Sequence, residues 1–300
     1  MGKVAFVFAG QGAQNVGMGR DLYRRFDSVR QLFDAHEEVR ELCFRGPNKQ
    51  LFQTQNAQLA LFLTDIACAT VLTENGIAAE GVAGFSLGEI PAACYAGLLE
   101  TAQGFALVRR RAGAMQACAE KHSGAMFAVL KLSVGEVEDI CTTLPHAYPA
   151  NYNCSEQTVV ACAESTAGTL RQRVEEAGGK TIRLAVSGAF HSPFMDAASE
   201  SVGLYLERES LGEMRIPLYA NATARVYEYP RETLALQINR PVMWQKTIEN
   251  MVEDGYDVFV EVGPGTTLSR LIKKINPNVL TLNISDSQSL ERTVEELRHA

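Results

Sequence analysis

GVAGFSLGEIPAA, residues 81–93, is the stretch from which the fold can be inferred. Small and apolar residues precede Ser86, which lies between Gly84 and Gly88. We expect a short buried strand, a sharp turn and a helix, because the flanking glycines lack the Cβ atoms that would clash in such a turn. The serine hydroxyl would then lie at the start of a helix, where N–H groups and the helix dipole favour a developing negative charge. The pattern alone fits a catalytic serine and an ordinary strand-to-helix turn about equally well.

Strand and helix patterns alternate on both sides of this stretch. Helical periodicity of the apolar residues predicts helices over residues 21–39, 58–75 and 101–120. Apolar runs predict strands within residues 1–8 and 258–262, followed by the turns GQGAQ (10–14) and GPG (263–265). Strands that alternate with helices in this way predict a parallel α/β core.

The segment from about 125 to 187 has a different order of elements. Its patterns predict strands over 126–132, 148–152, 158–162 and 181–186, with helices over 134–144 and 166–177. The resulting order, βαββαβ, is typical of a small ferredoxin-like subdomain. We therefore expect this segment to be an insertion into the larger α/β domain.

The composition is that of a globular protein without a nucleic-acid or membrane partner. Of 300 residues, 46% are hydrophobic and 21% are charged, and the net charge of −7 disfavours nonspecific binding to nucleic acid or acidic lipid. We expect no apolar stretch of membrane-spanning length, and the N-terminal run lacks the features of a signal peptide. The seven cysteines form no CxxC pair and have no histidine at metal-ligand spacing. Reduced thiols, no metal site and a cytoplasmic location are the expectation.

A serine nucleophile needs a base, and His191 is the histidine best placed to supply it. It follows a predicted strand and a Ser-Gly break, and it precedes a helix that opens at Pro193. The other four lie in a polar helix, where the side chain is expected to face solvent, in two turns and beside the C-terminus: His36, His122, His146 and His299. A histidine in a loop is often only structural, so its position alone is weak evidence. His191 is assigned as the base because the other four histidines are less suitable.

Five motifs occur in the order found in one enzyme family: GQGAQ (10–14), GFSLGE (84–89), Arg111 with MQ (115–116), AFHS (189–192) and EVGPG (261–265). With these motifs the chain closely resembles the malonyl-CoA:acyl-carrier-protein transacylases of bacterial fatty-acid synthesis and the acyltransferase domains of polyketide synthases. The resemblance covers residues 4 to about 274. It implies an α/β-hydrolase-like parallel-sheet core (1–124 and 188–300) with an inserted ferredoxin-like subdomain (125–187).

The resemblance also implies roles for the motif residues. Ser86 would be the nucleophile and His191 the general base and acid. Backbone N–H groups of Gln11 and Leu87 would form the oxyanion hole. Arg111 would bind the free carboxylate of a malonyl group, because its planar guanidinium can donate two charge-assisted hydrogen bonds.

Three further positions concern orientation and specificity. By resemblance, a backbone carbonyl at Met243, where the family usually has Gln, would accept the proton on the second ring nitrogen of His191. Phe85 stands where the family usually has His, which leaves the acyl preference open. Phe190 fits the pattern of malonyl-selective members, and its ring would crowd an α-methyl branch.

The implied reaction transfers malonyl from malonyl-CoA to the phosphopantetheine thiol of an acyl carrier protein, through a malonyl-serine, in fatty-acid synthesis. The enzyme would be a cytoplasmic monomer without a permanently bound cofactor or metal. A discrete trans-acting acyltransferase of a polyketide synthase is the alternative, and a thioesterase or a non-catalytic carrier-binding module also stays open. Candidate basic clusters for an acidic carrier are Arg109–Arg111 and Lys273–Lys274.

Overall fold

The computed structural model describes residues 2–299, which form two compact units. The first comprises the chain up to Ala112, Ser210–Tyr219 and the chain from Asn250 onward. The second comprises Gly113–Glu209 and Ala220–Glu249. The predicted insertion, residues 125–187, falls inside the second unit together with segments on both sides of it, and its boundaries stay a prediction.

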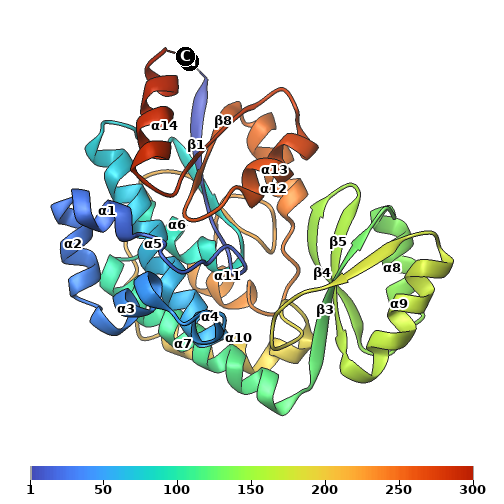
Figure 1. Ribbon diagram of the computed structural model, residues 1–300. Helices are drawn as coiled ribbons and strands as arrows, with labels where there is room; N and C mark the ends of the chain where they lie inside the picture. The colour runs from blue at the N-terminus through green and yellow to red at the C-terminus, as the bar shows by residue number, and fades with distance from the viewer. Residues whose placement is uncertain (1, 300) are drawn as a thin grey trace. The chain divides into compact units, whose positions relative to one another are not determined.

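A five-stranded sheet lies at the centre of the first unit, with helices on both sides of it (Figure 1). Its strand order is β7-β2-β1-β8-β9, and every neighbouring pair is parallel. The strands are β1 (Lys3–Phe8), β2 (Gly81–Gly84), β7 (Leu218–Tyr219), β8 (Tyr256–Val262) and β9 (Leu280–Ile284). Because helices cover both faces, the last five residues of β1 are all buried and all apolar. The predicted parallel α/β core is confirmed.

The helices of the first unit are α1 (Arg20–Arg25), α2 (Asp27–Asp34), α3 (Glu37–Arg45), α4 (Asn48–Leu51), α5 (Thr54–Glu74), the 3₁₀ turn η1 (Ser86–Gly88), α6 (Glu89–Tyr95), α13 (Thr267–Ile275) and α14 (Ser287–His299). Two more helices, α7 (Thr101–Lys121) and α12 (Trp244–Glu253), contribute residues to both units.

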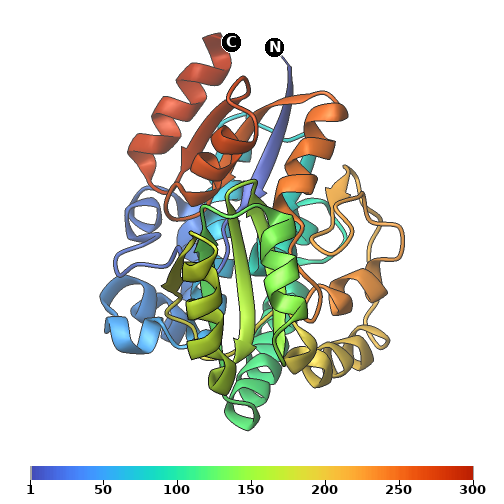
Figure 2. The same cartoon turned by 90° about the vertical axis from the view of Figure 1, so that its right-hand side faces the viewer.

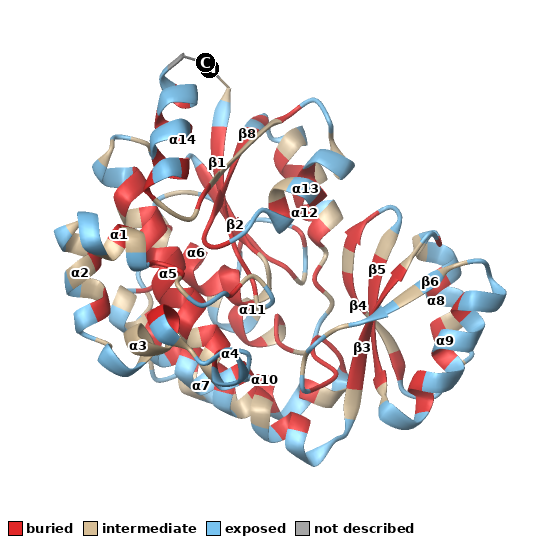
Figure 3. Ribbon diagram, viewed as in Figure 1, coloured by how far each residue is buried: buried red, intermediate tan, exposed pale blue. Residues whose placement is uncertain are grey.

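Helix α5 corrects one expectation from the sequence. By length and composition it could cross a membrane, with 21 residues and a mean hydropathy of 1.3 over its most apolar window. However, 72% of that window is buried inside the protein, which is typical of the central helix of a globular core. Figure 3 shows this helix as mostly buried along its length.

The helix predicted over residues 21–39 is wrong as a single element. The chain forms α1, α2 and α3 there, and it breaks at Phe26, whose backbone is extended, and at His36. Neither residue is a glycine or a proline, so no local signal marks the turns. The turns allow the rings of Phe33 and Phe44 to pack against Tyr23, and this tertiary packing outweighs the local helical pattern.

The second unit contains a four-stranded antiparallel sheet of order β4-β5-β3-β6. Its elements are β3 (Gly124–Leu130), α8 (Val134–Thr142), β4 (Ala147–Cys154), β5 (Gln157–Ala163), η2 (Glu164–Thr166), α9 (Ala167–Glu176) and β6 (Lys180–Arg183). Figure 2 looks onto the sheet face that α8 and α9 cover. The predicted βαββαβ order is confirmed. The unit also includes η3 (Pro193–Met195), α10 (Asp196–Leu206) and α11 (Pro230–Leu236).

One edge of the parallel sheet gathers three of the sequence motifs. Strands β1, β2 and β8 are neighbours, and their last residues, Phe8, Gly84 and Val262, lie in register. The loops that follow these strands are GQGAQ, GFSLGE and GPG. In parallel sheets, sites form at the carboxyl ends of the strands, so the fold itself brings these loops together.

Candidate functional site

The turn that carries Ser86 has the strained geometry of a nucleophile elbow. Ser86 has a φ of 54°, which is unusual for a residue with a side chain. A Cβ at Gly84 would lie 1.9 Å from the carbonyl carbon of Gly88, and one at Gly88 would lie 2.2 Å from the carbonyl oxygen of Phe8. Only glycine fits at both places. The flanking glycines therefore allow the turn to close against β1, as the sequence predicts.

The loop after β1 lies directly against this turn. A Cβ at Gly10 would be 2.4 Å from the carbonyl oxygen of Phe85 and 3.0 Å from its ring. Gln11, the next residue, is therefore held beside the elbow. Leu87 follows Ser86 at the start of η1, where backbone N–H groups lack intrahelical partners. This arrangement supports an oxyanion site made from the two amides, which stays a prediction.

Arg111 reaches the same place from helix α7. Its side chain is 1% exposed, and its Nη2 donates a hydrogen bond of 3.0 Å to Oγ of Ser86. The preceding Arg109 and Arg110 are exposed, because consecutive helical positions point in different directions. Of the three consecutive arginines, only Arg111 points into the protein.

Burial lowers the pKa of the Arg111 guanidinium to about 10, while the negative charge of Glu89 acts in the opposite direction. Glu89 opens helix α6 and has no exposed surface. A buried guanidinium needs such a counter-charge, because desolvation is otherwise expensive. Glu89 belongs to the quoted GFSLGE motif, but sequence reasoning gave it no role. An acid in an otherwise apolar stretch was the available signal.

A second residue that sequence reasoning missed is Gln58 on helix α5. It has no exposed surface, and its Oε1 accepts a hydrogen bond of 2.7 Å from Nη1 of Arg111. Its Nε2 donates to Oε1 of Gln11 at 3.3 Å. Gln11 in turn donates through Nε2 to Oγ1 of Thr54 at 3.3 Å. Side chains thus connect the glycine-rich loop to Arg111, which lies beside Ser86.

In the second unit, His191 has a defined orientation. The residue is 3% exposed and has a φ of 57°. Its Nδ1 lies 2.9 Å from the backbone carbonyl oxygen of Gln237. A carbonyl oxygen can only accept, so Nδ1 carries the proton and the Nε2 lone pair of the neutral ring can accept one. The ring is therefore in the tautomer that a general base requires.

The assignment of Met243 as the source of this carbonyl is wrong. The Met243 carbonyl instead accepts hydrogen bonds from N and Oγ1 of Thr247, at 2.8 and 2.9 Å, in the first turn of α12. The acceptor for His191 lies six residues earlier in the same segment, at Gln237. Because any residue offers a backbone carbonyl, side-chain identity gave no way to choose between these positions.

Comparisons with known proteins identify the family of the chain. Residues 5–290 match the family described as "Acyl transferase domain". The chain belongs to the acyl transferase family. It is 33% identical to a malonyl CoA-acyl carrier protein transacylase of Bacillus subtilis, over 99% of this chain and 98% of that protein. A crystal structure of the protein with that name from Clostridium perfringens matches with a TM-score of 0.95 and 34% identity, over 99% of this chain and 98% of the other.

Another solved structure similar to this acyl transferase is a malonyl-transacylase in complex with its type II polyketide acyl-carrier protein. It matches with a TM-score of 0.94 and 30% identity, over 98% of this chain and 99% of that one. The predicted fold class, a parallel α/β core with a ferredoxin-like part, is confirmed by these neighbours.

The remaining predicted residues of this acyl transferase have the following positions. Phe85 is partly buried, with its ring over Gly10, and Phe190 is 5% exposed beside Gly188. Their roles in acyl specificity stay predictions. His36 does not simply face solvent, because its ring stacks on Phe105 at 3.8 Å. Burial, and then the charge of Arg109, lowers its pKa.

His122 and His146 are exposed, and the side chain of His299 lies outside the described residues. All seven cysteines are free thiols, and six of them are buried. Within the described part of the chain, no group of three or more His, Cys, Asp or Glu side chains could hold a metal ion.

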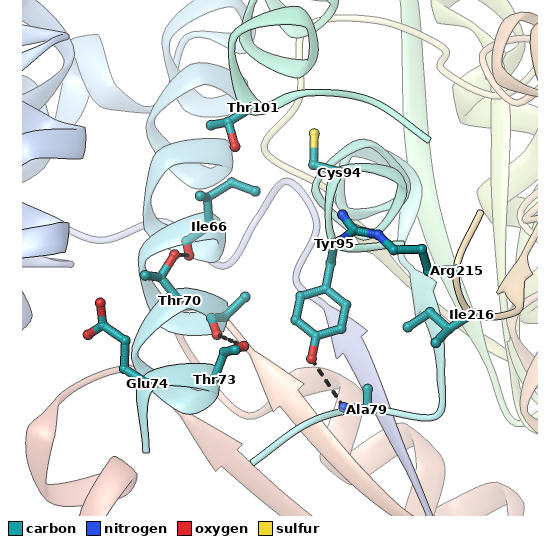
Figure 4. Close-up of a pocket in the computed structure, with 11 residues that line it drawn as sticks. Ile66, Thr70, Thr73, Glu74, Ala79, Cys94, Tyr95, Thr101, Arg215 and Ile216 are labelled. Atoms are coloured by element: carbon teal, nitrogen blue, oxygen red, sulfur yellow. Dashed lines mark hydrogen bonds between the residues drawn. The ribbon is translucent and has the colours of Figure 1, made fainter. Parts of the chain in front are cut away.

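A pocket of about 530 Å³ elsewhere in the first unit contains none of the predicted site residues. Figure 4 shows it between α5, the end of α6 and residues 215–216. The Tyr95 hydroxyl in its wall accepts a hydrogen bond of 3.1 Å from the amide of Ala79. Its charged side chains, Glu74 and Arg215, are both exposed. None of the motif residues lines this pocket.

Proposed function

We propose that this acyl transferase moves a malonyl group from malonyl-CoA to the phosphopantetheine thiol of an acyl carrier protein. The observation that carries the proposal is the hydrogen bond of 3.0 Å from the buried guanidinium of Arg111 to Oγ of Ser86. In a malonyl thioester, the carboxylate is two bonds from the carbon that the serine attacks. A guanidinium that reaches the nucleophile is therefore positioned to bind that carboxylate.

The reaction has two steps. Oγ of Ser86 attacks the thioester carbonyl and gives its proton to Nε2 of His191. The carbon–sulfur bond then breaks, and coenzyme A leaves as a thiol with that proton. The carrier thiol attacks the malonyl-serine ester in the reverse sequence, and Ser86 recovers its proton. Amides of Gln11 and Leu87 stabilise the oxyanion in both steps.

The backbone carbonyl of Gln237 fixes the tautomer of His191 but adds no negative charge. The imidazolium formed during the reaction is therefore less stabilised than in a Ser-His-Asp triad. A thioester is an activated acyl donor, so this weaker base is sufficient. The chemistry needs no permanently bound cofactor and no metal.

Several finer features are part of the proposal. The names of the similar proteins support an acyl carrier protein as the partner. A cytoplasmic location and a monomeric state are expected, and fatty-acid synthesis is favoured over a polyketide pathway as the setting.

Of the candidate docking clusters, Arg109 and Arg110 are exposed, but Arg111 is buried and cannot contact a carrier surface. The Lys273 ammonium group already donates to the carbonyl of Pro277 at 3.2 Å.

The covalent intermediate provides the test. Purified protein is mixed with malonyl-CoA in the absence of a carrier, and the intact mass and the peptide containing Ser86 are measured. We expect a malonyl adduct on that peptide, release of coenzyme A, and no adduct in Ser86→Ala. Addition of a phosphopantetheinylated carrier should discharge the adduct onto its thiol. Failure to form the adduct would contradict the proposal, and discharge to water alone would indicate a thioesterase.

A further inference from the structure

Gln58 connects the two parts of the site that act on opposite ends of the acyl group. Arg111 contacts Ser86 through Nη2 and Gln58 through Nη1. Gln58 in turn contacts the side chain of Gln11, whose backbone amide is a candidate oxyanion donor. The arginine and the oxyanion loop are therefore connected through one amide side chain.

The direction of every hydrogen bond in this chain is fixed by the arginine. A guanidinium has only donors, so Gln58 must present its oxygen to Arg111. Its NH₂ group must then face Gln11, and Gln11 must present its own oxygen in return. The remaining NH₂ of Gln11 faces the hydroxyl of Thr54. Each glutamine accepts on one side and donates on the other, which no charged or apolar side chain of this size can do.

Helix α5 supplies a rigid base for this arrangement. Thr54 and Gln58 are four residues apart, so they lie on the same face of the first turns of the helix. They are 2% and 0% exposed. Together they hold the side chain of Gln11 at two points. The loop around Gln11 contains glycines on both sides and would otherwise have wide backbone freedom.

The two contacts of Arg111 differ in what substrate binding does to them. A malonyl carboxylate can replace the Ser86 hydroxyl as the acceptor for Nη2, because the hydroxyl must be free to react. The bond of 2.7 Å to Gln58 uses Nη1 and persists. In a buried setting this charge-assisted bond is strong, and it keeps the guanidinium plane fixed while its other partner changes.

We propose that Gln58 is a positioning residue that aligns Arg111 for the acyl carboxylate and, through Gln11, aligns the oxyanion loop. The inference rests on the proposed function. Loss of Gln58 should therefore have two separate effects. The preference for malonyl over acetyl should fall, because the guanidinium is no longer oriented, and kcat should fall for both acyl groups, because the loop amide is no longer held.

The test compares Gln58→Met, Gln58→Glu and Gln11→Ala with the wild type, by kcat and KM for malonyl-CoA and acetyl-CoA. Methionine keeps the volume of Gln58 but removes both hydrogen bonds. We expect it to lower the malonyl-over-acetyl ratio of kcat/KM about tenfold, as for loss of one buried bond to a charged group. Glutamate can still accept from Arg111, but its charge competes with the substrate carboxylate, so the ratio should fall at least as far.

Gln11→Ala separates the two effects, since it should lower kcat for both substrates and leave their ratio within about twofold. Thr64→Val is the matched control. Thr64 is fully buried on the same helix, and its hydroxyl donates to the carbonyl of Ala60 and not to the network around Arg111. The malonyl-over-acetyl ratio of Thr64→Val should therefore equal that of the wild type. In an Arg111→Ala background, Gln58→Met should produce no further change in the ratio.

The outcomes are distinguishable from those of the proposed function. A wild type without preference for malonyl over acetyl would contradict the function, and the inference with it. A wild type that prefers malonyl, combined with an unchanged ratio in both Gln58 variants, would overturn the inference alone. An equal loss of ratio in Thr64→Val would also overturn it, because the effect would then be one of general destabilisation.

Discussion

Two glutamines with no exposed surface, Gln58 in the first unit and Gln237 in the second, contact predicted site residues in different ways. Gln58 acts through its side chain, which accepts from Arg111 and donates to Gln11. Gln237 acts on His191 through its backbone carbonyl. Gln58 therefore contacts Arg111 through a group that substitution can remove, whereas Gln237 contacts His191 through a backbone group that every substitution keeps.

The largest expected effect concerns His191, the proposed catalytic base. His191→Ala should reduce kcat for malonyl transfer by about 10⁴-fold, because the serine then has no group to take its proton. The carbonyl of Gln237 would lose its partner but cannot replace the imidazole. Steady-state transfer to a carrier protein measures the loss, and the circular dichroism spectrum serves as the control for folding. A loss below about tenfold would show that His191 is not the base.

The next effect tests the chemistry of the side-chain network around Arg111. Arg111→Lys keeps a positive charge but cannot donate to Gln58 and to a carboxylate in one plane. We expect kcat/KM for malonyl-CoA to fall about 100-fold, while kcat/KM for acetyl-CoA changes by less than about threefold. Parallel assays with the two thioesters measure the ratio. Equal losses for both substrates would remove Arg111 from carboxylate binding.

A third effect concerns a buried polar side chain that has no such network. Asp65 lies on the same helix as Gln58 and has no exposed surface, and within residues 2–299 neither carboxyl oxygen has a hydrogen-bond partner. Burial, and then the charge of Glu261, raises the pKa of Asp65 well above its usual value. When the pH is above the usual pKa of an aspartate, the carboxyl group of Asp65 is ionised in the unfolded chain but keeps its proton in the folded protein.

Asp65 should therefore make folding less favourable as the pH rises, until the pH exceeds its pKa in the folded protein. The free energy of unfolding of Asp65→Asn, relative to that of the wild type, should increase by up to about 1.4 kcal/mol per pH unit. Urea unfolding of both proteins between pH 5 and pH 8 measures this slope. Parallel pH profiles for the two proteins would show that Asp65 is ionised in the folded state.

Most of the fold follows from local sequence patterns. Apolar runs, the glycines around Ser86 and the βαββαβ order were sufficient to predict β1, β2 and β8, the turn at Ser86 and the order of elements in the antiparallel sheet. The three helices between Arg20 and Arg45 could not be predicted, because their breaks depend on ring contacts among Tyr23, Phe33 and Phe44. Local patterns do not encode contacts between separate elements.

The residues of the candidate site also differ in whether local sequence patterns predict them. Ser86, Arg111 and Gln11 lie in motifs, and the structure brings them together in the first unit. Gln58 lies in a largely apolar helical stretch, and a buried polar side chain is the only sign of its role, a sign that it shares with Thr54, Thr64 and Asp65 on the same helix. Gln237 has no such sign, because its contribution is a carbonyl group that every residue possesses. Met243 was therefore an equally reasonable prediction, and it was wrong.

The smallest expected effect is the one that separates the two glutamines most directly. The same substitution, glutamine to methionine, can be made at both positions, and it removes a buried amide of equal size each time. Gln58→Met should lower catalysis and selectivity, whereas Gln237→Met keeps the carbonyl that holds Nδ1 of His191. We expect kcat to change by less than about threefold in Gln237→Met, and ¹⁵N NMR of His191 should still show the proton on Nδ1. A loss of kcat in Gln237→Met as large as that in Gln58→Met would mean that both glutamines act through their side chains.

Selectivity gives a second criterion for comparing the two glutamines. The malonyl-over-acetyl ratio of kcat/KM depends on Arg111, so we expect Gln237→Met to keep the ratio of the wild type. This holds even if the substitution lowers the free energy of unfolding.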